Sequence, residues 1–359
     1  MSDRIAVTAN LRKYYADFIE EFTVSLRAEI DAGAFIIIDS TVFALYRERF
    51  IDILPEKRFV IIEATEYNKT IDKCKEIIEF LVESGLRKNE RLIALGGGVI
   101  QDITAFTASI LYRGIDWVFF PTTLLAQADS CIGSKTSINL GEKKNLVGNF
   151  YPPKHIYIDP AFLESLSVDD VKSGIGEIMH FYLYSNSPYF NKLIENYDEL
   201  IRNRSLLIDY IKESLSIKKS VIEVDEFDKG ERNKFNYGHT FGHAIESITD
   251  YKVKHGQAVT IGMDIANYLS FKIGIMTKEV FNTLQNLLSK NFPEYWWNNF
   301  DREGYFRALS KDKKNIGDNV VCILSEGPGR LVKKQLPLDG EFKEIIKEYF
   351  AQIIKCAQK

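Results

Sequence analysis

The fold of this chain is decided by one stretch, Arg91-Leu92-Ile93-Ala94-Leu95-Gly96-Gly97-Gly98. Its first five residues form a mostly apolar run of strand length, and three glycines follow where that strand would end. A helical pattern comes next, from Asp102 to Tyr112, and then a second apolar run, from Asp116 to Phe120. A strand, a helix and a strand in this order predict a parallel sheet that is covered by helices.

The same alternation extends toward the N-terminus. Two runs rich in β-branched residues, 35–39 and 59–62, predict two further buried strands. Between residues 70 and 86, apolar side chains recur every three or four positions, as they do on one face of an amphipathic helix. The parallel sheet is therefore expected to contain at least four strands.

The pattern changes after Tyr151-Pro152-Pro153 and a last short strand at 155–158. Beyond that point the chain reads as mostly helical, for example over 205–223. We therefore predict an α/β protein whose first domain, residues 1–158, contains the parallel sheet. A mostly helical second domain is expected over residues 159–359.

The composition excludes several classes of protein. Of the 359 residues 45% are apolar, and 24 Phe, 18 Tyr and 3 Trp are too many aromatic side chains for a long disordered chain. The net charge of −4 shows no basic excess, so we expect no binding of nucleic acid. No apolar run approaches the roughly 18 residues that span a membrane. The four cysteines form no C-x-x-C pair and the first residues show no signal-peptide pattern, so we expect a cytoplasmic protein.

The glycines at 96–98 lie between a strand and a helix, where backbone N–H groups can approach a pyrophosphate. They do not form the common dinucleotide motif G-x-G-x-x-G. By themselves they leave two interpretations open, a nucleotide-binding turn and a plain tight turn.

Three of the five histidines lie close together, namely His239, His243 and His255. The first two are four residues apart and share one face of a helix, a spacing typical of metal ligands. Thr240 stands where a zinc protease would have glutamate, so that class is excluded. Glu177 is the candidate carboxylate ligand. Ordinary core or surface histidines are the alternative interpretation.

Two polar segments, 129–145 and 232–236, are rich in Lys, Arg and Asn. Such side chains supply the positive charge and the N–H donors that a phosphate or carboxylate group requires. A solvated charged loop is the alternative interpretation for both segments.

Together these motifs resemble the 3-dehydroquinate synthase family of sugar-phosphate cyclases. The matching pieces keep the order and spacing of the family over most of the chain; they are LIALGGGVIQD (92–102), YRG (112–114), FPTTLLAQADS (120–130), KTSINLGEKKNLVGNFYPP (135–153), GEIMHFY (176–182), ERNKFNYGHTFGHAIE (231–246) and HGQAV (255–259). The resemblance implies an N-terminal NAD-binding α/β domain and a C-terminal helical domain that binds a metal.

The resemblance also implies roles for individual residues. One divalent metal ion, zinc or cobalt, would be held by Glu177, His239 and His255. NAD would be held by Glu66, Lys69, Gly97, Gly98, Asp102, Thr122, Thr123, Lys135 and Lys144. The substrate site would contain Asp129, Lys135, Asn145, His180, Lys218, Arg232, Asn236 and His243, with Lys313 or Lys314 as a phosphate contact. Arg113 would reach the active site of a neighbouring subunit, which implies a homodimer.

The implied reaction converts a phosphorylated sugar acid, 3-deoxy-D-arabino-heptulosonate 7-phosphate, to 3-dehydroquinate and phosphate. An alcohol is oxidised, phosphate is eliminated, the ketone is reduced again, and an intramolecular aldol step closes the ring, so NAD is recycled. One alternative is a cyclase for a different heptulose phosphate. Another is a metal-dependent NAD(P) polyol dehydrogenase, which would have no use for Arg113, Lys135, Asn145 and Arg232.

Several positions depart from the family pattern. Gln101 stands where glycine is usual, Ser134 replaces the second glycine before the Lys-Thr pair, and Gln257 replaces the glutamate of H-G-E-A-V. The largest departure is His180, where the family usually has a lysine that contacts the substrate. A neutral imidazole offers one donor on a short arm. We expect either a different contact to a substrate hydroxyl or carboxylate group, or a side chain that only fills space.

Overall fold

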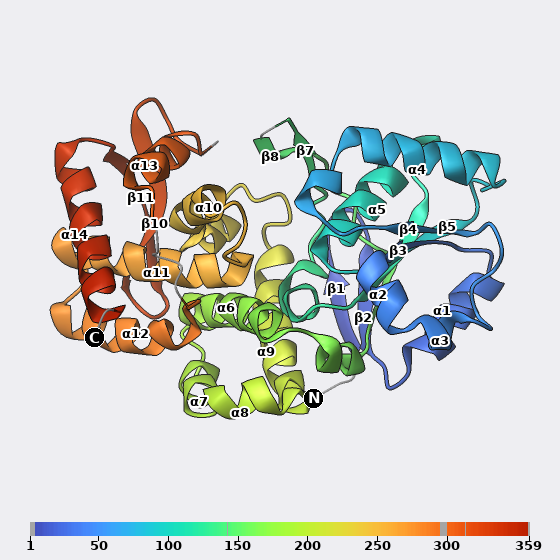
Figure 1. Ribbon diagram of the computed structural model, residues 1–359, viewed down its shortest axis with the longest axis horizontal. Helices are drawn as coiled ribbons and strands as arrows, with labels where there is room; N and C mark the ends of the chain where they lie inside the picture. Colours follow the sequence, from blue (N-terminus) through green and yellow to red (C-terminus); the bar gives the residue numbers. More distant parts are fainter. Residues whose placement is uncertain (1–3, 142, 295–299, 313, 358–359) are drawn as a thin grey trace. The chain divides into compact units, whose positions relative to one another are not determined.

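The computed structural model describes residues 4–141, 143–294, 300–312 and 314–357, with side chains as far as residue 352. The chain forms two compact units (Figure 1). The first contains Met1–Ser167 and Asn203–Asp228, and the second contains Val168–Arg202 and Lys229–Lys359.

A seven-stranded sheet forms the centre of the first unit, in the order β1-β2-β9-β6-β5-β3-β4. The strands are β1 (Arg4–Thr8), β2 (Lys13–Phe18), β3 (Phe35–Asp39), β4 (Phe59–Ile62), β5 (Arg91–Gly96), β6 (Asp116–Pro121) and β9 (His155–Ile158). β1 pairs with β2 in antiparallel fashion, and the remaining pairs in this sheet are parallel. The predicted parallel sheet is therefore confirmed, whereas the β1–β2 hairpin was not predicted.

Helices cover both faces of this sheet (Figure 1). They are α1 (Phe22–Asp31), α2 (Ser40–Leu45), α3 (Arg47–Phe50), α4 (Ile71–Glu83) and α5 (Gly98–Ile110). Helix α9 (Leu207–Ile222) belongs to the same unit. Alternate strand residues point to opposite faces, so Ile36 and Ile38 pack in one core with Phe22 of α1 and Phe50 of α3. Since both faces are covered, the inner residues of the central strands β3, β5 and β6 are apolar, and charged residues stand only at their ends.

Helix α5 begins at Gly98, four residues before the predicted start at Asp102, and Gly97 is its N-cap residue. Three glycines gave no periodic signal, because apolar periodicity can be recognised only where side chains exist. The first N–H groups of α5 therefore belong to the glycine turn. Backbone N–H groups at such a helix N-terminus attract anions.

The second unit is mostly helical, as predicted. Its helices are α6 (Val168–Ser185), α7 (Tyr189–Glu195), α8 (Tyr197–Arg202), α10 (His239–Ile248), α11 (His255–Lys272), α12 (Lys278–Leu288), α13 (Arg302–Ser310) and α14 (Gly340–Ala357), and a hairpin joins β10 (Asn319–Gly327) to β11 (Arg330–Pro337). Every residue of α11 from Gly256 to Ser270 is buried, so this helix forms the centre of the unit.

One carboxylate lies in the middle of this buried helix. Asp264 Oδ2 accepts hydrogen bonds from the Tyr349 hydroxyl at 2.8 Å and from Gln285 Nε2 at 3.2 Å. Burial raises the pKa of Asp264 from 3.8 to about 6, because an ionised carboxylate is poorly solvated in this position.

The two compact units do not coincide with the predicted domains, 1–158 and 159–359, in two segments. Residues 159–167 and helix α9 belong to the unit that contains the sheet. Helix α9 packs there because Ser214 donates a hydrogen bond to the Ala128 carbonyl at 2.8 Å and Lys218 pairs with Asp129. The predicted division concerns where the two functions lie, and it stays a prediction.

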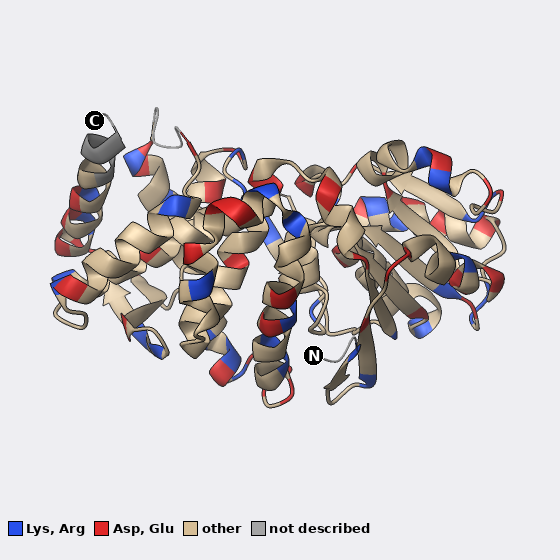
Figure 2. Cartoon of the chain, turned by 90° about the horizontal axis from the view of Figure 1, so that it is seen from below, with Lys and Arg blue, Asp and Glu red and all other residues tan. Residues whose placement is uncertain are grey.

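Charges of both signs are interspersed along the helices of each unit (Figure 2). This distribution agrees with the small net charge of −4. Among the residues that the structure describes, no helix is both long enough and apolar enough to cross a membrane.

Candidate active site

Three potential metal ligands meet in the second unit. Glu177 comes from α6, and His239 and His255 are the first residues of α10 and α11. Glu177 Oε1 lies 3.6 Å from His239 Nε2 and 3.3 Å from His255 Nε2. One ligand atom from each of the three residues lies within 4.8 Å of the other two. The fold thus brings together the three residues that the resemblance implied as metal ligands.

This donor set fits a divalent metal ion. In a tetrahedral zinc site with bonds of about 2.0–2.1 Å, the donor atoms lie roughly 3.3–3.4 Å apart, close to the two separations between Glu177 and the histidines. Glu177 Oε1 is buried, and none of its contacts with described residues has the geometry of a hydrogen bond. Imidazole nitrogen and carboxylate oxygen are donors that suit Zn²⁺ and Co²⁺.

Glu246 orients one of these histidines. Its Oε2 atom lies 3.1 Å from His255 Nδ1, so the Nδ1–H group can donate to the carboxylate and Nε2 is left as a ligand. His239 Nδ1 has a similar contact, 3.3 Å from the Tyr237 carbonyl oxygen. The sequence analysis did not single out Glu246. Its only signal was its position three residues after His243, on the same side of the predicted helix.

The buried charges of this cluster act on one another. Burial tends to raise the pKa of Glu177, but the His239 and His255 imidazoles outweigh it and hold that pKa below its usual range. Burial lowers the pKa of His239 well below its ordinary value. Burial acts in the same direction on His255, yet the Glu246 and Glu177 carboxylates raise its pKa well above the ordinary value.

Glycines allow α6 and α11 to approach closely beside the ligands. A Cβ atom on Gly176, which precedes Glu177, would lie 2.1 Å from the Gly256 carbonyl oxygen. A Cβ atom on Gly256, which follows His255, would lie 1.7 Å from the Ser173 carbonyl oxygen. Only glycine fits at either position, and the close backbone contact sets the separation between Glu177 and His255.

Glycines also allow α10 to approach α11 closely. Gly238, directly before His239, has a positive φ of 81°, and a Cβ atom there would lie 2.7 Å from the Val259 carbonyl oxygen of α11. A Cβ atom on Gly262 would in turn lie 2.0 Å from the Gly238 carbonyl oxygen. The third ligand is therefore placed by glycine packing as well.

His180, predicted to contact the substrate, lies beside the ligand candidates. It is 1% exposed, and its Nδ1 atom is 3.8 Å from Glu177 Oε2. Its ring packs against Phe235 and Tyr237, with the ring centre 5.1 Å from that of His239. A direct contact between His180 and a substrate stays a prediction.

Further predicted substrate residues gather in the second unit. Lys314 Nζ donates to Asn236 Oδ1 at 3.2 Å and lies 3.2 Å from Asp312 Oδ2. Arg232 is buried in the short helix η6 (Glu231–Asn236), whereas His243 is exposed on α10. Lys313, the other predicted phosphate contact, lies outside the described residues.

Predicted NAD contacts gather in the first unit, where β4 and β5 end. Lys69 Nζ lies 2.8 Å from Asp102 Oδ2, and Lys144 Nζ lies 3.9 Å from Glu66 Oε2. Burial raises the pKa of Asp102, and the Lys69 ammonium group opposes that shift. Ligands of open α/β sheets bind at these carboxyl ends.

The glycine turn and the next strand complete this edge of the sheet. Gly97 and Gly98 open α5, and Thr122 N donates to the Gly96 carbonyl at 3.0 Å. Thr123 Oγ1 accepts a hydrogen bond from Ala126 N at 3.2 Å. These four predicted NAD contacts thus come from two adjacent strand ends.

Asn139 organises the NAD side, and the sequence analysis missed it. It lies in β7 (Ile138–Leu140), which pairs with β8 (Lys143–Val147). Its side chain donates to Glu66 Oε2 at 3.0 Å and accepts from the Asn145 backbone N–H at 2.9 Å. Its own N–H donates to the Lys69 carbonyl at 2.8 Å. A neutral asparagine within a strand carries no sequence signal for these contacts.

Two cationic side chains of the first unit are held by carboxylates. Lys218 Nζ lies 2.7 Å from both the Asp129 carboxylate and the Asp129 carbonyl oxygen. Lys135 forms an ion pair with Asp228. Two of the predicted substrate contacts, Asp129 and Lys218, are therefore in direct contact.

Arg113 lies on a strained turn. Tyr112, Arg113 and Gly114 have φ values of 51°, 65° and 111°, a region that residues other than glycine rarely adopt. The Arg113 side chain is exposed and makes no hydrogen bond or ion pair with any described residue. Strain of this kind occurs preferentially at functional positions.

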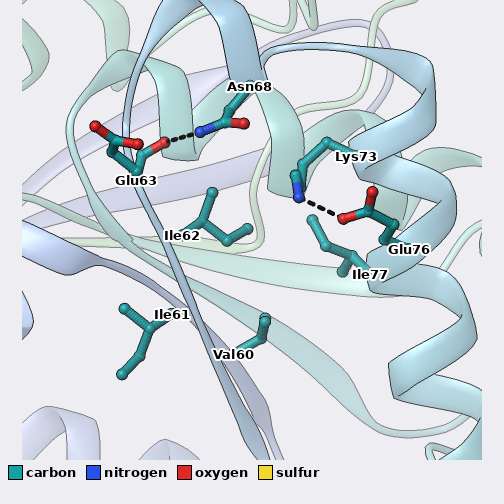
Figure 3. Close-up of a pocket in the computed structure, with 8 residues that line it drawn as sticks. All are labelled: Val60, Ile61, Ile62, Glu63, Asn68, Lys73, Glu76 and Ile77. Carbon is teal, nitrogen blue, oxygen red and sulfur yellow. Dashed lines mark hydrogen bonds and ion pairs between the residues drawn. The ribbon is translucent and has the colours of Figure 1, made fainter.

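A pocket of about 290 Å³ lies between β4 and α4, next to the short helix η1 (Glu66–Asn68) (Figure 3). Lys73 forms an ion pair with Glu76 in it, and Asn68 donates to the Glu63 carbonyl at 2.8 Å. Its lining consists of Val60, Ile61, Ile62, Glu63, Asn68, Lys73, Glu76 and Ile77. None of these is a predicted site residue, but the pocket borders the predicted NAD contacts Glu66 and Lys69, because Asn68 lies between them in sequence.

Comparison with known proteins assigns the chain to a family. Residues 59–173 match the family model described as 3-dehydroquinate synthase N-terminal, and residues 174–315 match 3-dehydroquinate synthase C-terminal. The chain belongs to the 3-dehydroquinate synthase family. The resemblance inferred from the sequence is thereby confirmed, and the chain is an enzyme, a 3-dehydroquinate synthase-like cyclase.

Curated relatives in this family are similar over nearly the whole chain. The 3-dehydroquinate synthase of Clostridium tetani (strain Massachusetts / E88) is 35% identical over 351 residues, which cover 96% of this chain and 91% of that protein. The 3-dehydroquinate synthase of Helicobacter pylori (strain P12) is 36% identical over 339 residues, which cover 93% and 96%.

The fold of this chain is similar to those of several solved structures. A 2-deoxy-scyllo-inosose synthase complexed with carbaglucose-6-phosphate, NAD⁺ and Co²⁺ is 26% identical with a TM-score of 0.84, and the match covers 96% of this chain and 99% of that one. A glycerol dehydrogenase from Schizosaccharomyces pombe is 16% identical with a TM-score of 0.57, covering 98% and 92%, and shares the fold alone. The predicted fold, an α/β part with a parallel sheet followed by a mostly helical part, is therefore confirmed.

Proposed function

We propose that this protein converts 3-deoxy-D-arabino-heptulosonate 7-phosphate to 3-dehydroquinate and phosphate, with NAD and one divalent metal ion. The observation that carries the proposal is the meeting of Glu177, His239 and His255 in a member of the 3-dehydroquinate synthase family. The polyol dehydrogenase alternative is not favoured, because curated relatives over nearly the whole chain are 3-dehydroquinate synthases.

Both cofactors have residues suited to them. Glu177, His239 and His255 would hold the zinc or cobalt ion, with Glu246 fixing the orientation of His255. NAD would be held in the first unit, by Glu66, Lys69, Gly97, Gly98, Asp102, Thr122, Thr123, Lys135 and Lys144. When bound, the metal ion polarises a substrate oxygen as a Lewis acid, and NAD accepts a hydride that it later returns.

The cationic residues would bind the two acidic groups of the substrate. Lys135, Lys218 and Lys314 supply ammonium groups, and Arg232 supplies the forked guanidinium group that matches a carboxylate. Charges of this kind would also stabilise the phosphate group as it leaves. The proposed substrate site further contains Asp129, Asn145, His180, Asn236 and His243.

Arg113 would complete the site of a second copy of the chain, so the protein would act as a homodimer. Three observations support this proposal: the side chain is exposed, its backbone is strained, and it has no polar partner among the described residues. An exposed guanidinium group on this turn can bind a phosphate group on another molecule.

The test is an assay of phosphate release over a panel of seven-carbon sugar phosphates, with NADH followed in parallel. We expect phosphate release from the heptulosonate phosphate without net formation of NADH. Net NADH without phosphate would instead identify a dehydrogenase. Phosphate release from another heptulose phosphate alone would show that the substrate is different.

A further inference from the structure

Three consecutive carbonyl groups at the end of one short helix are each capped by a side chain from elsewhere in the first unit. The helix is η3 (Ala126–Ser130), a π-helix, a rare form that is frequent at functional sites. The last carbonyls of any helix lack partners within it. The pairs are Ala128 O with Ser214 Oγ at 2.8 Å, Asp129 O with Lys218 Nζ at 2.7 Å, and Ser130 O with Gln101 Nε2 at 2.6 Å.

Gln101 contributes the third cap, and it does so with both ends of its amide. Its Nε2 group donates to the Ser130 carbonyl, and its Oε1 atom accepts from the Ser130 hydroxyl, each at 2.6 Å. Gln101 is 5% exposed, so water does not compete for these bonds. Ser214 and Lys218 both come from α9, whereas Gln101 comes from α5, the helix that begins at Gly98.

The pair of hydrogen bonds between Gln101 and Ser130, called the Gln101–Ser130 tie below, holds a residue that is next to a predicted substrate contact. Ser130 directly follows Asp129, whose carboxylate holds Lys218 Nζ at 2.7 Å. A displacement of Ser130 would therefore shift Asp129 and the ammonium group paired with it. The family pattern has glycine at position 101, and glycine has no side chain that could form the tie.

The far end of the same segment is held in a similar way. The Ser134 hydroxyl donates to Glu226, a carboxylate that is 1% exposed and that also accepts from the Asn10 backbone N–H at 2.7 Å. Ser134 also stands where the family pattern has glycine. Residues 130–134 are thus fixed at both ends by side-chain hydrogen bonds that glycine could not form.

We propose that Gln101 is a positioning residue, which holds η3 so that Asp129 and Lys218 are set for the phosphorylated substrate. The proposal rests on the function proposed above, because that function makes Asp129 and Lys218 substrate contacts. Gln101 itself would touch neither substrate nor NAD.

The first measurement is amide hydrogen exchange over residues 126–135 of the full-length enzyme with NAD, in Gln101→Met and Gln101→Gly. Methionine keeps the size of the side chain without its hydrogen bonds, and glycine is the residue of the family pattern. The matched control is Thr104→Val on the same helix, because Thr104 is buried and its hydroxyl has no hydrogen-bond partner among the described residues. Exchange should become faster in both Gln101 variants and stay unchanged in the control.

The second measurement separates positioning from general stability. Loss of the two hydrogen bonds should raise KM for the heptulosonate phosphate by about tenfold in Gln101→Met. The Kd for NAD should stay unchanged and kcat should fall less than KM rises. Ser130→Ala, which removes one of the two bonds, should give an intermediate KM.

Wild-type exchange and wild-type KM in both Gln101 variants would overturn the proposal. An increase in the Kd for NAD as large as the increase in KM would also overturn it, because it would indicate that α5 itself is disturbed. If the wild-type enzyme released no phosphate from the heptulosonate phosphate, the proposed function would fail. Faster exchange in the Gln101 variants would then support the tie alone, and unchanged exchange would reject it.

Discussion

Replacing Gly256 by alanine should weaken metal binding without changing any ligand side chain. The new Cβ atom would lie 1.7 Å from the Ser173 carbonyl oxygen, so α6 and α11 must separate by about 1.7 Å before this contact reaches an ordinary 3.4 Å. The separation would also break the bond of 3.0 Å from Gly256 N–H to the Ser173 hydroxyl. Overpacking and one lost hydrogen bond together cost roughly 2–4 kcal/mol.

The ligands move with their helices. Glu177 lies on α6 and His255 on α11, and their donor atoms are now 3.3 Å apart, near the separation that a tetrahedral ion needs. Opening this pair should lower affinity for Zn²⁺ by about 10–100-fold, as changes just outside the ligand set commonly do.

The assay is competition for Zn²⁺ against a chelator, with circular dichroism to show that the variant is folded. Gly340→Ala is the matched control, because a Cβ atom there meets nothing within 4 Å. A folded Gly256→Ala protein with wild-type metal affinity would refute the argument that glycine packing sets the ligand geometry.

Three further outcomes are expected. Glu246→Gln should reduce affinity for Zn²⁺ by about 10-fold or more, measured by the same competition, because His255 loses a charged acceptor. Asp264→Asn should raise the midpoint of thermal unfolding at neutral pH. The pKa of Asp264 is 3.8 in an unfolded chain and about 6 in the folded protein. The folded protein therefore loses free energy of unfolding as the pH rises from about 4 to about 6, by about 3 kcal/mol at most. The advantage of the variant should therefore disappear near pH 4, and an advantage independent of pH would contradict this reasoning. Arg113→Ala should raise KM for the sugar phosphate while NAD affinity is kept, and a fully active monomer in sedimentation would rule out its role across subunits.

Local sequence patterns were sufficient for the parallel strands β3, β4, β5, β6 and β9 and for the class of the fold. The runs at 35–39 and 91–95 could be recognised because the inner residues of strands buried on both faces are apolar. The run at 59–62 is apolar too, but it forms the edge strand β4, where Ile61 is 39% exposed. Glu177, His239 and His255 could be recognised by residue type, spacing and resemblance, since metal chemistry admits few donor types. The hairpin of β1 and β2 was missed because its alternation of buried and exposed residues is short and irregular.

Only the tertiary structure decided which residues support those ligands and contacts. Asn139 and Glu66 are 73 positions apart in sequence, and Gln101 and Ser130 are 29 apart, so no local pattern could join them. A hydrogen bond depends on distance and direction in space, and amide side chains form the same bonds in many surroundings. The sequence alone therefore determined the chemistry available to this protein. Packing of backbones at Gly176 and Gly256 determined where that chemistry is held, because a separation of a few ångströms between helices depends on both partners at once.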